Sequence, residues 1–443
     1  MQSRKRIAAL IGATAIILGA CSGGGTPAPS TAAAPSGAAP ASAAAQPSTA
    51  AANPVTINWW HITTDKVGKP LFQSIADAYV KDHPNVTIKL TVLENEAFKA
   101  KLTATAPGDY PDLFQSWGGG GMAAQAQAGL LKDITSDVAD IKDTINPGAL
   151  GIYALDGKQY GLPWDVGMMG VWYNKDLFSK AGISAPPATW DDFLADVSKL
   201  KASGVAPLAI AGKDKWPSMH LWTYLVLRIG GGDALQQMIQ TGNYNTDACT
   251  KAGEQVLALN KLDPYQAGFA SATYPQEAAA VGNGKAAMEV MGQWAPAVEN
   301  DNSADKKGLG DKLGWFPFPS VAGGAGAATD GVGGGNGIAV SAKAPPEAVD
   351  FLKFFVNTDN ANKLNTSGIG MSPVNGTGGS ITDPNLKAVL AGRDQAKFIQ
   401  LYLDQAVPPS VGAVVNDATV ALFLGKSDAA TACKALTDAA ANP

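Results

Sequence analysis

Charged residues and long apolar runs are both scarce in this chain of 443 residues. Asp, Glu, Lys and Arg make up only 16% of it, and the formal net charge at pH 7 is −5. An acidic chain without a basic tract argues against nucleic acid as a partner. After the first twenty residues no apolar run approaches the ~20 residues that a membrane-spanning helix needs, so we expect no such helix there.

Several catalytic and cofactor motifs are also missing. The sequence has no CxxC pair, no HExxH and no GxSxG, and its three histidines, His61, His83 and His220, lie far apart. Neither glycine-rich run, 118–121 or 331–337, has the Gly-Lys-Ser/Thr sequence or the GxGxxG-then-helix order that binds phosphate. We therefore expect neither a metal nor a cofactor. The simplest alternative for each glycine run is a plain surface loop.

The amino terminus has the features of a bacterial export signal. A positive head at 4–6 precedes an apolar stretch at 7–18, which is too short to span a membrane, and a Leu-Gly-Ala-Cys sequence then ends at Cys21. This ending resembles the lipobox, whose cysteine receives a diacylglycerol and becomes the first residue of the mature chain. We predict a signal peptide over 1–20 and an exported protein that a lipid on Cys21 anchors to the outer face of the cell membrane or on the periplasmic side. An ordinary signal peptide that cuts near a thiol is the alternative.

A low-complexity linker, residues 21–53, follows the predicted cleavage site. After Cys21 it contains only Ser, Gly, Thr, Pro, Ala, Gln and Asn. Such a segment cannot bury enough apolar area to offset the entropy of ordering, so we expect a flexible tether. The two remaining cysteines, Cys249 and Cys433, then lie in an oxidising setting, where we predict that they pair.

Strand and helix patterns alternate along the rest of the chain, which is long enough for two domains. A strand pattern at 55–60, a helix pattern at 68–82 and an alternating strand pattern at 86–92 form a βαβ unit. Further strands are predicted at 111–117 and 338–340, and a helix after Thr189, whose sequence is that of a capping box. This order predicts an α/β fold with mostly parallel sheets.

Tryptophans at the ends of these elements suggest a sugar site. Ligands of α/β sheets lie beyond the carboxyl ends of the strands, and an indole offers a flat face to a sugar ring and an N–H to a hydroxyl. Trp59 and Trp222 are in phase with apolar neighbours and are predicted to lie in the core. The candidate ligand-binding residues are Trp60, His61, Glu94, Trp117, Asp165, Trp216, His220, Trp294 and Asn336. Core packing is the alternative for each tryptophan.

Five segments form a recognisable combination. They are YGLPWD at 160–165, WYNKDLF at 172–178, PPATWDDF at 186–193, GKAAMEVMGQW at 284–294 and FPFP at 316–319. In this order they are similar to extracellular solute-binding protein family 1 of carbohydrate ABC importers, and the similarity covers essentially all of the chain after the linker. Trp-Pro at 216–217 and Leu-Trp-Thr-Tyr at 221–224 look most like the branch that binds xylobiose and other short oligosaccharides.

The resemblance implies a type II periplasmic-binding-protein fold, with two α/β lobes that close about a hinge over a ligand cleft. Lobe one would contain 54–163 and 320–374, and lobe two 170–319 and 375–443. The chain would cross between the lobes near 163–169, near 318–321 and after Pro373. Both Cys249 and Cys433 would then lie in lobe two, where a disulfide leaves hinge bending free.

The function implied is that of a monomeric lipoprotein that binds a substrate for an importer and is not an enzyme. Its partners would be a short neutral oligosaccharide, with xylobiose as the first expectation, and the transmembrane subunits of an ABC permease, and its only membrane contact would be the lipid. Carried over residue by residue, the family's cleft tryptophan falls on Trp294, the strand-end aromatic on Trp117, the acidic group by the first crossing on Asp165, and a polar sugar contact on Glu94.

Two other classes of function stay open. A surface glycoside hydrolase needs two carboxylates about 5 to 9.5 Å apart, for which Asp165, Glu94 and Glu289 are the candidates near expected cleft positions. A glycan-binding adhesin would need an open platform in place of a cleft.

Overall fold

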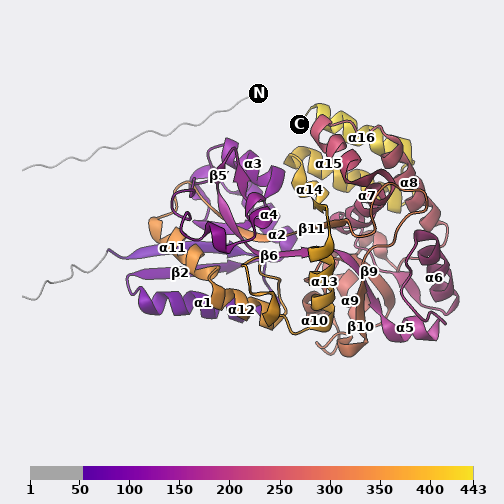
Figure 1. The fold of residues 1–443 in the computed structure, drawn as a ribbon, viewed down its shortest axis with the longest axis horizontal. Coiled ribbons are helices and arrows are strands. Elements are labelled where there is room, and N and C mark those ends of the chain that lie inside the picture. The colour runs from indigo at the N-terminus through magenta and orange to yellow at the C-terminus, as the bar shows by residue number, and fades with distance from the viewer. Residues whose placement is uncertain (1–52, 443) are drawn as a thin grey trace, which may run out of the picture. The chain divides into compact units, whose positions relative to one another are not determined.

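The computed structural model describes residues 53–442, which form one folded body of two lobes (Figure 1). The predicted signal peptide, Cys21 and nearly all of the predicted linker lie outside the described residues. Within 53–442, no helix combines the length and the apolar character needed to cross a membrane.

Lobe one is built on a six-stranded sheet. Its strands are β1 (Val55–His61), β2 (Val86–Val92), β3 (Leu113–Ser116), β6 (Gly161–Met168), β11 (Gly331–Val340) and β12 (Ile399–Leu401). The order is β12-β11-β3-β1-β2, and β6 pairs with β11 off this path. The strand β1 runs parallel to β2 and β3, whereas β11 runs parallel to β12 and antiparallel to β3 and β6.

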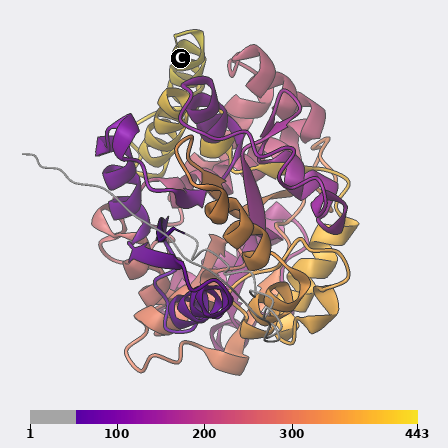
Figure 2. The same ribbon diagram turned by 90° about the vertical axis from the view of Figure 1, so that its left-hand side faces the viewer.

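Helices cover both faces of this sheet. They are α1 (Gly68–Asp82), α2 (Asn95–Ala104), α3 (Gly119–Gln127), α4 (Pro147–Gly151), α11 (Pro346–Phe355) and α12 (Thr358–Ser367), with the hairpin β4 (Ala154–Leu155) and β5 (Lys158–Gln159). One core joins Ile57 and Trp59 to α1 and α11, and a smaller one joins Phe114 to Phe98 and Met122 of α2 and α3. Figure 2 turns lobe one toward the viewer, with indigo α1 and orange α11 in front.

Lobe two is built on a four-stranded sheet in the order β10-β7-β9-β8. Its strands are β7 (Gly170–Asn174), β8 (Ala206–Leu208), β9 (Ala286–Met291) and β10 (Leu313–Phe316). Its helices are α5 (Lys175–Lys180), α6 (Trp190–Ala202), α7 (Trp216–Thr241), α8 (Asp247–Asn260), α9 (Tyr274–Gly282), α10 (Ala295–Asn302), α13 (Pro384–Gln395), α14 (Leu403–Ala406), α15 (Pro409–Phe423) and α16 (Ala429–Ala441). Short 3-10 turns lie at Pro107–Asp109, Lys142–Thr144, Phe269–Ser271, Gly310–Lys312 and Gly378–Ser380.

A disulfide joins two helices of lobe two, as predicted. Cys249 of α8 and Cys433 of α16 have Cα atoms 6.1 Å apart and are separated by 184 residues. Because both cysteines lie in the same buried cluster, the bridge ties the last helix to the core of this lobe and leaves the other lobe unconstrained.

The chain passes directly between the two sheets at the junction of β6 and β7. It stays with lobe two after β10, because the loop 317–330 packs on the buried Arg228 of α7. The guanidinium of Arg228 donates to the backbone carbonyls of Phe318, Pro319, Ala327, Ala328 and Asp330. The lobe boundary predicted at residue 320 therefore differs from the packing, which keeps 320–330 with lobe two until β11 begins.

Several sequence-based predictions of local structure are confirmed, and others are wrong. The helix at 68–82 and the strand at 86–92 have the predicted bounds, and Thr189 caps α6 by accepting from the Asp192 backbone N–H at 3.2 Å. The sheets are mixed and not mostly parallel, since β7 also runs antiparallel to β9 and β10. The glycine run 331–337 lies inside β11, and Gly119 begins a helix where a loop was the alternative.

Candidate functional site

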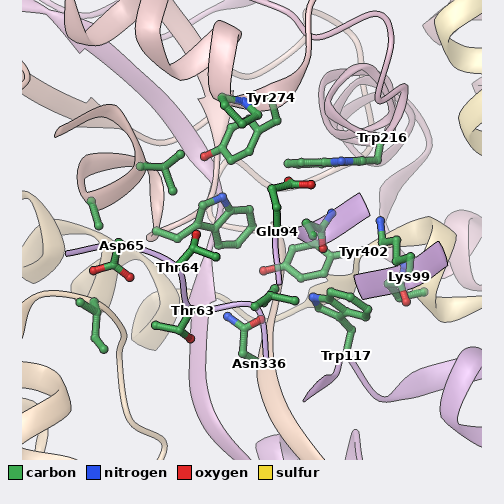
Figure 3. Close-up of a pocket in the computed structure, with 18 of the residues that line it drawn as sticks. Thr63, Thr64, Asp65, Glu94, Lys99, Trp117, Trp216, Tyr274, Asn336 and Tyr402 are labelled. Carbon is green, nitrogen blue, oxygen red and sulfur yellow. The ribbon is translucent and has the colours of Figure 1, made fainter. Parts of the chain in front are cut away.

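A cavity of about 430 Å³ lies between the two lobes. Lobe one contributes the segments that follow β1, β2 and β3, while lobe two contributes the starts of α7, α9 and α14 and the turn before α10. The cavity is rich in aromatic side chains, which are Trp117, Trp164, Trp216, Tyr274, Trp294 and Tyr402. Figure 3 shows Trp117 and Trp216 approaching the cavity from opposite sides.

The aromatic groups of lobe two form one continuous wall. The Trp216 ring centroid lies 4.9 Å from that of Tyr274 and 5.2 Å from that of His220, both at steep angles. The Tyr402 ring lies 5.7 Å from His220 and 5.8 Å from Trp294. These steeply inclined ring contacts hold each ring in place, so the wall is a fixed surface against which a flat ligand can pack.

Several buried polar atoms of this wall have no hydrogen-bond partner in the described part of the chain. The indole N–H of Trp216, both ring nitrogens of His220 and the hydroxyls of Tyr274 and Tyr402 are buried without a hydrogen-bond partner within residues 53–442, and so is the indole N–H of Trp164. Burial, with a smaller effect of Lys99, lowers the pKa of His220 to about 3, so its imidazole is neutral and offers one donor and one acceptor. Buried polar groups normally find partners, and a ligand with several hydroxyls would supply them.

Charged groups line the cavity mainly from lobe one. An Asp65 carboxylate oxygen accepts from the backbone N–H groups of Val67 at 3.0 Å and Gly68 at 2.6 Å, and burial raises the pKa of this carboxyl. Glu94 caps α2 by accepting from the Glu96 backbone N–H at 2.9 Å. Lys99, one helical turn further along α2, also lines the cavity from lobe one, and Asp404 lines it from lobe two.

Asn336 is held at the cavity by a buried network around Asp165. Asn336 accepts from the Gln115 side chain at 2.7 Å and donates to Asp165 at 2.9 Å. Asp165 also accepts from the Gln293 side chain at 2.8 Å and from the Met371 backbone N–H at 2.7 Å. Burial raises the pKa of Asp165 to about 6. Because these residues come from β3, β6, β11, the segment before α10 and the segment after α12, the network joins the two lobes beneath the cavity.

Six of the nine predicted ligand-binding residues line the cavity, and three do not. Those that line it are Glu94, Trp117, Trp216, His220, Trp294 and Asn336. His61 is buried 4.8 Å from Trp59 and 5.0 Å from Phe72, ring to ring, and burial lowers its pKa to about 4. Trp60 packs under Lys101, and Asp165 is fully buried below Asn336. We therefore assign these three residues structural roles.

Sequence reasoning missed Lys99, Tyr274 and Tyr402 as cavity residues. Tyr274 follows a capping box at Thr273 and precedes Pro275. These two signals mark the start of a helix and would have placed Tyr274 at an element end, like the predicted tryptophans. No pattern marks Lys99 or Tyr402. Within residues 53–442, no group of three or more His, Cys, Asp or Glu side chains is arranged to hold a metal ion.

This chain is similar to known proteins both in sequence and in its two-lobed structure. The sequence profile of bacterial extracellular solute-binding proteins matches residues 65–362. A structure from a study of xylan utilization by Caldanaerobius polysaccharolyticus superposes with a TM-score of 0.80 at 26% identity, covering 86% of this chain and 99% of that one. A chitin oligosaccharide binding protein gives a TM-score of 0.79 at 24% identity, covering 88% and 98%. The predicted two-lobed α/β fold is confirmed.

Similar sequences include proteins named for ABC transport and sugars. A multiple sugar-binding protein of Streptococcus mutans is 27% identical over 303 residues, which are 64% of this chain and 67% of that protein. An uncharacterized ABC transporter extracellular-binding protein of Pyrococcus horikoshii is 29% identical over 246 residues, 54% of this chain. The chain thus spans 55% of the length of this second relative.

Proposed function

Because this chain belongs to the bacterial extracellular solute-binding protein family, we propose that it binds a short neutral oligosaccharide between its lobes and delivers it unchanged to an ABC importer. The observation that carries the proposal is the inter-lobe cavity, whose aromatic wall holds buried polar atoms that have no hydrogen-bond partner among residues 53–442. Indole faces suit the C–H faces of sugar rings, and the unpartnered N–H, hydroxyl and imidazole groups suit sugar hydroxyls. Closure of the lobes would then complete the contacts.

Specific residues take specific roles in this proposal. Trp294 would stack on a sugar ring, Trp117 and Trp216 would border the sugar at one end of the cavity, and Glu94, Asn336 and His220 would exchange hydrogen bonds with hydroxyls. Asp165 would act indirectly, because its hydrogen bond fixes the Asn336 amide that faces the cavity. A carboxylate such as Glu94 accepts hydrogen bonds from neutral sugars without requiring a charge on them.

Xylobiose is our first choice of sugar. The resemblance of residues 216–224 to xylobiose-binding members supports it, as does the fold shared with a protein studied for xylan utilization. A xylose/arabinose-binding protein of Haloferax volcanii is also 26% identical over 270 residues of this chain.

Calorimetry and thermal unfolding with xylobiose, chitobiose and maltose test the proposal. A bound sugar at about a hundred times its dissociation constant should stabilise the protein by about 2.7 kcal/mol. Closure should also reduce the radius of gyration in solution scattering, and the sugar should be recovered intact. Failure of xylobiose where another disaccharide binds would overturn only the choice of sugar, whereas no binding of any sugar would overturn the function.

The hydrolase alternative makes a different prediction for the same samples. Of its three candidate carboxylates, only Glu94 lines the cavity, while Asp165 and Glu289 are fully buried elsewhere. Sustained release of monosaccharide by the purified protein would favour that class. Binding to polymeric glycan but not to disaccharides would favour the adhesin.

Export and lipid attachment complete the proposal. Membership of an extracellular family supports export, and the Leu-Gly-Ala-Cys sequence ending at Cys21 motivates a lipid anchor. In the native host, Cys21→Ser should move the protein from the membrane fraction to the medium or periplasm. An unchanged fractionation, with no lipid mass on the mature amino terminus, would contradict the anchor. The permease subunits would be the partners that receive the sugar.

A further inference from the structure

Lys99 lies between two indoles that belong to different lobes. Its ammonium nitrogen is 5.4 Å from the ring centroid of Trp117 in lobe one and 6.0 Å from that of Trp216 in lobe two (Figure 3). Both distances fall within the ~6 Å range in which an aromatic face attracts a cation. The ammonium therefore occupies the interval between these two indoles.

Neighbouring residues hold Lys99 in this position. Glu96, three residues earlier on α2, lies 3.1 Å from the ammonium, and the Lys99 side chain is only 30% exposed. The positive charge is thus balanced within lobe one, so it does not call for an anionic ligand. His220, which continues the wall beyond Trp216, is neutral and does not repel it at ordinary pH.

This placement has a steric consequence for a sugar chain. A ring that stacks between Trp117 and Trp216 needs the volume that the Lys99 ammonium fills. The rest of the wall, formed by Tyr274, Trp294 and Tyr402, has no such cation over its rings among the contacts of the described residues. The cavity is therefore blocked at its Trp117 end and open to rings along the remainder.

We propose that Lys99 is a specificity-determining residue that closes this end of the cavity and so limits the length of the bound oligosaccharide. The inference rests on the proposed sugar binding and deepens it. The wild-type protein takes short chains because an additional sugar unit would have to displace an ammonium held by Glu96 and two indoles. Removing the Lys99 side chain adds a subsite between Trp117 and Trp216.

The test compares affinities for the series from xylobiose to xylohexaose by calorimetry. Wild type should gain little affinity beyond the shortest chains, whereas Lys99→Ala should favour the longer chains over xylobiose by at least ~10-fold more than wild type does. Lys99→Arg, which keeps a long cationic side chain, should retain the wild-type dependence of affinity on chain length. Lys101→Ala is the matched control, because Lys101 lies on the same helix with its ammonium 4.4 Å over Trp60, outside the cavity.

The outcomes separate this inference from the function on which it rests. If wild type binds xylobiose and Lys99→Ala has the same length profile, the role of Lys99 is overturned while sugar binding stands. If wild type binds no member of the series or any other sugar, both are overturned. Lys99→Ser provides a second opening variant should Lys99→Ala unfold, and a shifted profile in Lys101→Ala would also contradict the inference.

Discussion

Trp294 provides the clearest test of a single residue in the cavity wall. Its ring stands edge-on to Tyr402 at 5.8 Å, and the ring lies against Gly292, where a Cβ atom would overlap it. Trp294→Ala should weaken sugar binding by about 30-fold or more, because truncating a desolvated aromatic anchor typically costs over ~2 kcal/mol. Calorimetry with the sugar that binds wild type measures the change.

Trp60→Ala is the matched control for this substitution. Trp60 is an indole of lobe one that packs under Lys101 outside the cavity. Its loss should leave the dissociation constant nearly unchanged, although stability falls. Wild-type affinity in a folded Trp294→Ala protein would place the sugar on other rings.

Sequence reasoning located strand ends well but could not decide which residue at an end faces the ligand. Because side chains alternate along a strand, His61 points with Trp59 into the core beneath α1 and Trp60 points to the opposite face. The residues that line the cavity, Ile62 to Asp65, come just after β1 ends. The predicted residues, Trp60 and His61, therefore lie one or two positions before the first residue that lines the cavity. The alternation of side chains along a strand does not by itself show which of these positions faces the ligand.

At the scale of elements, the glycine-rich start of α3 lets the two lobes approach closely. A Cβ atom at Gly120 would overlap the backbone carbonyl of Val407 in lobe two, whereas at Gly121 the nearest atom is 3.9 Å away. Gly120→Ala should hinder closure, weaken sugar binding by about tenfold and reduce the contraction seen in solution scattering. Calorimetry and scattering with and without sugar check both effects.

Gly121→Ala separates this steric effect from helix propensity. Both substitutions replace glycine by alanine inside α3, which favours the helix by roughly 0.5–1 kcal/mol. Gly121→Ala should therefore bind sugar as wild type does and be slightly more stable. Equal binding by the two variants would show that this contact does not limit closure.

Three buried glutamates should make lobe two sensitive to pH. Glu277 of α9, Glu289 of β9 and Glu299 of α10 meet in its interior, and the carboxylate oxygens of Glu289 and Glu299 have no hydrogen-bond donor among the described residues. Burial raises the pKa of all three, to about 7 for Glu289, and the charge of Glu289 raises the pKa of the other two further. Protonated neighbours would supply the missing donors.

The sign of the pH effect follows from these raised pKa values. In the unfolded chain the carboxyls lose protons near their ordinary pKa of 4.5, whereas the folded protein retains them. The free energy of unfolding should therefore fall as pH rises from about 4.5 through about 7. Glu289→Gln should flatten this slope in denaturant titrations at about pH 5 and about pH 8, while the exposed Glu254→Gln should not. Parallel slopes for wild type and Glu289→Gln would refute the assignment.

Local patterns predicted elements more successfully than they predicted pairing. The apolar spacing of α1 and the alternation in β2 fix these elements within their own sequence. The direction of β11 and its pairing with β3 and β6 depend on residues far away in the chain, so no local signal shows that the sheets are mixed. The glycines of β11 belong in a strand because the Asp165 and Gly167 carbonyls approach Gly335 and Gly333 too closely for a side chain.

At the scale of the whole folded body, the two lobes also touch across the mouth of the cleft. The backbone N–H of Lys66, in the loop after β1, donates to the Asp301 carboxylate of α10 at 2.7 Å, and the Lys66 ammonium lies 3.8 Å from the same carboxylate. The ammonium also donates to the Lys306 carbonyl. Asp65, which lines the cavity, is the adjacent residue, so we expect this contact to form only when the lobes close over the proposed ligand site.

Asp301→Ala should therefore speed sugar release without preventing binding. The lost contact stabilises only the closed state, and because Lys66 is half exposed its contribution should be about 1 kcal/mol, which is about a fivefold faster dissociation. Association should change little, since the lobes are apart when the sugar enters. Stopped-flow measurement of tryptophan fluorescence gives both rates, and added salt should speed release in wild type more than in the variant.

Asp438→Ala is the control, because it removes an exposed ion pair within α16 alone and should alter neither rate. If both aspartate variants release sugar at the wild-type rate, the contact between Lys66 and Asp301 does not hold the cleft closed.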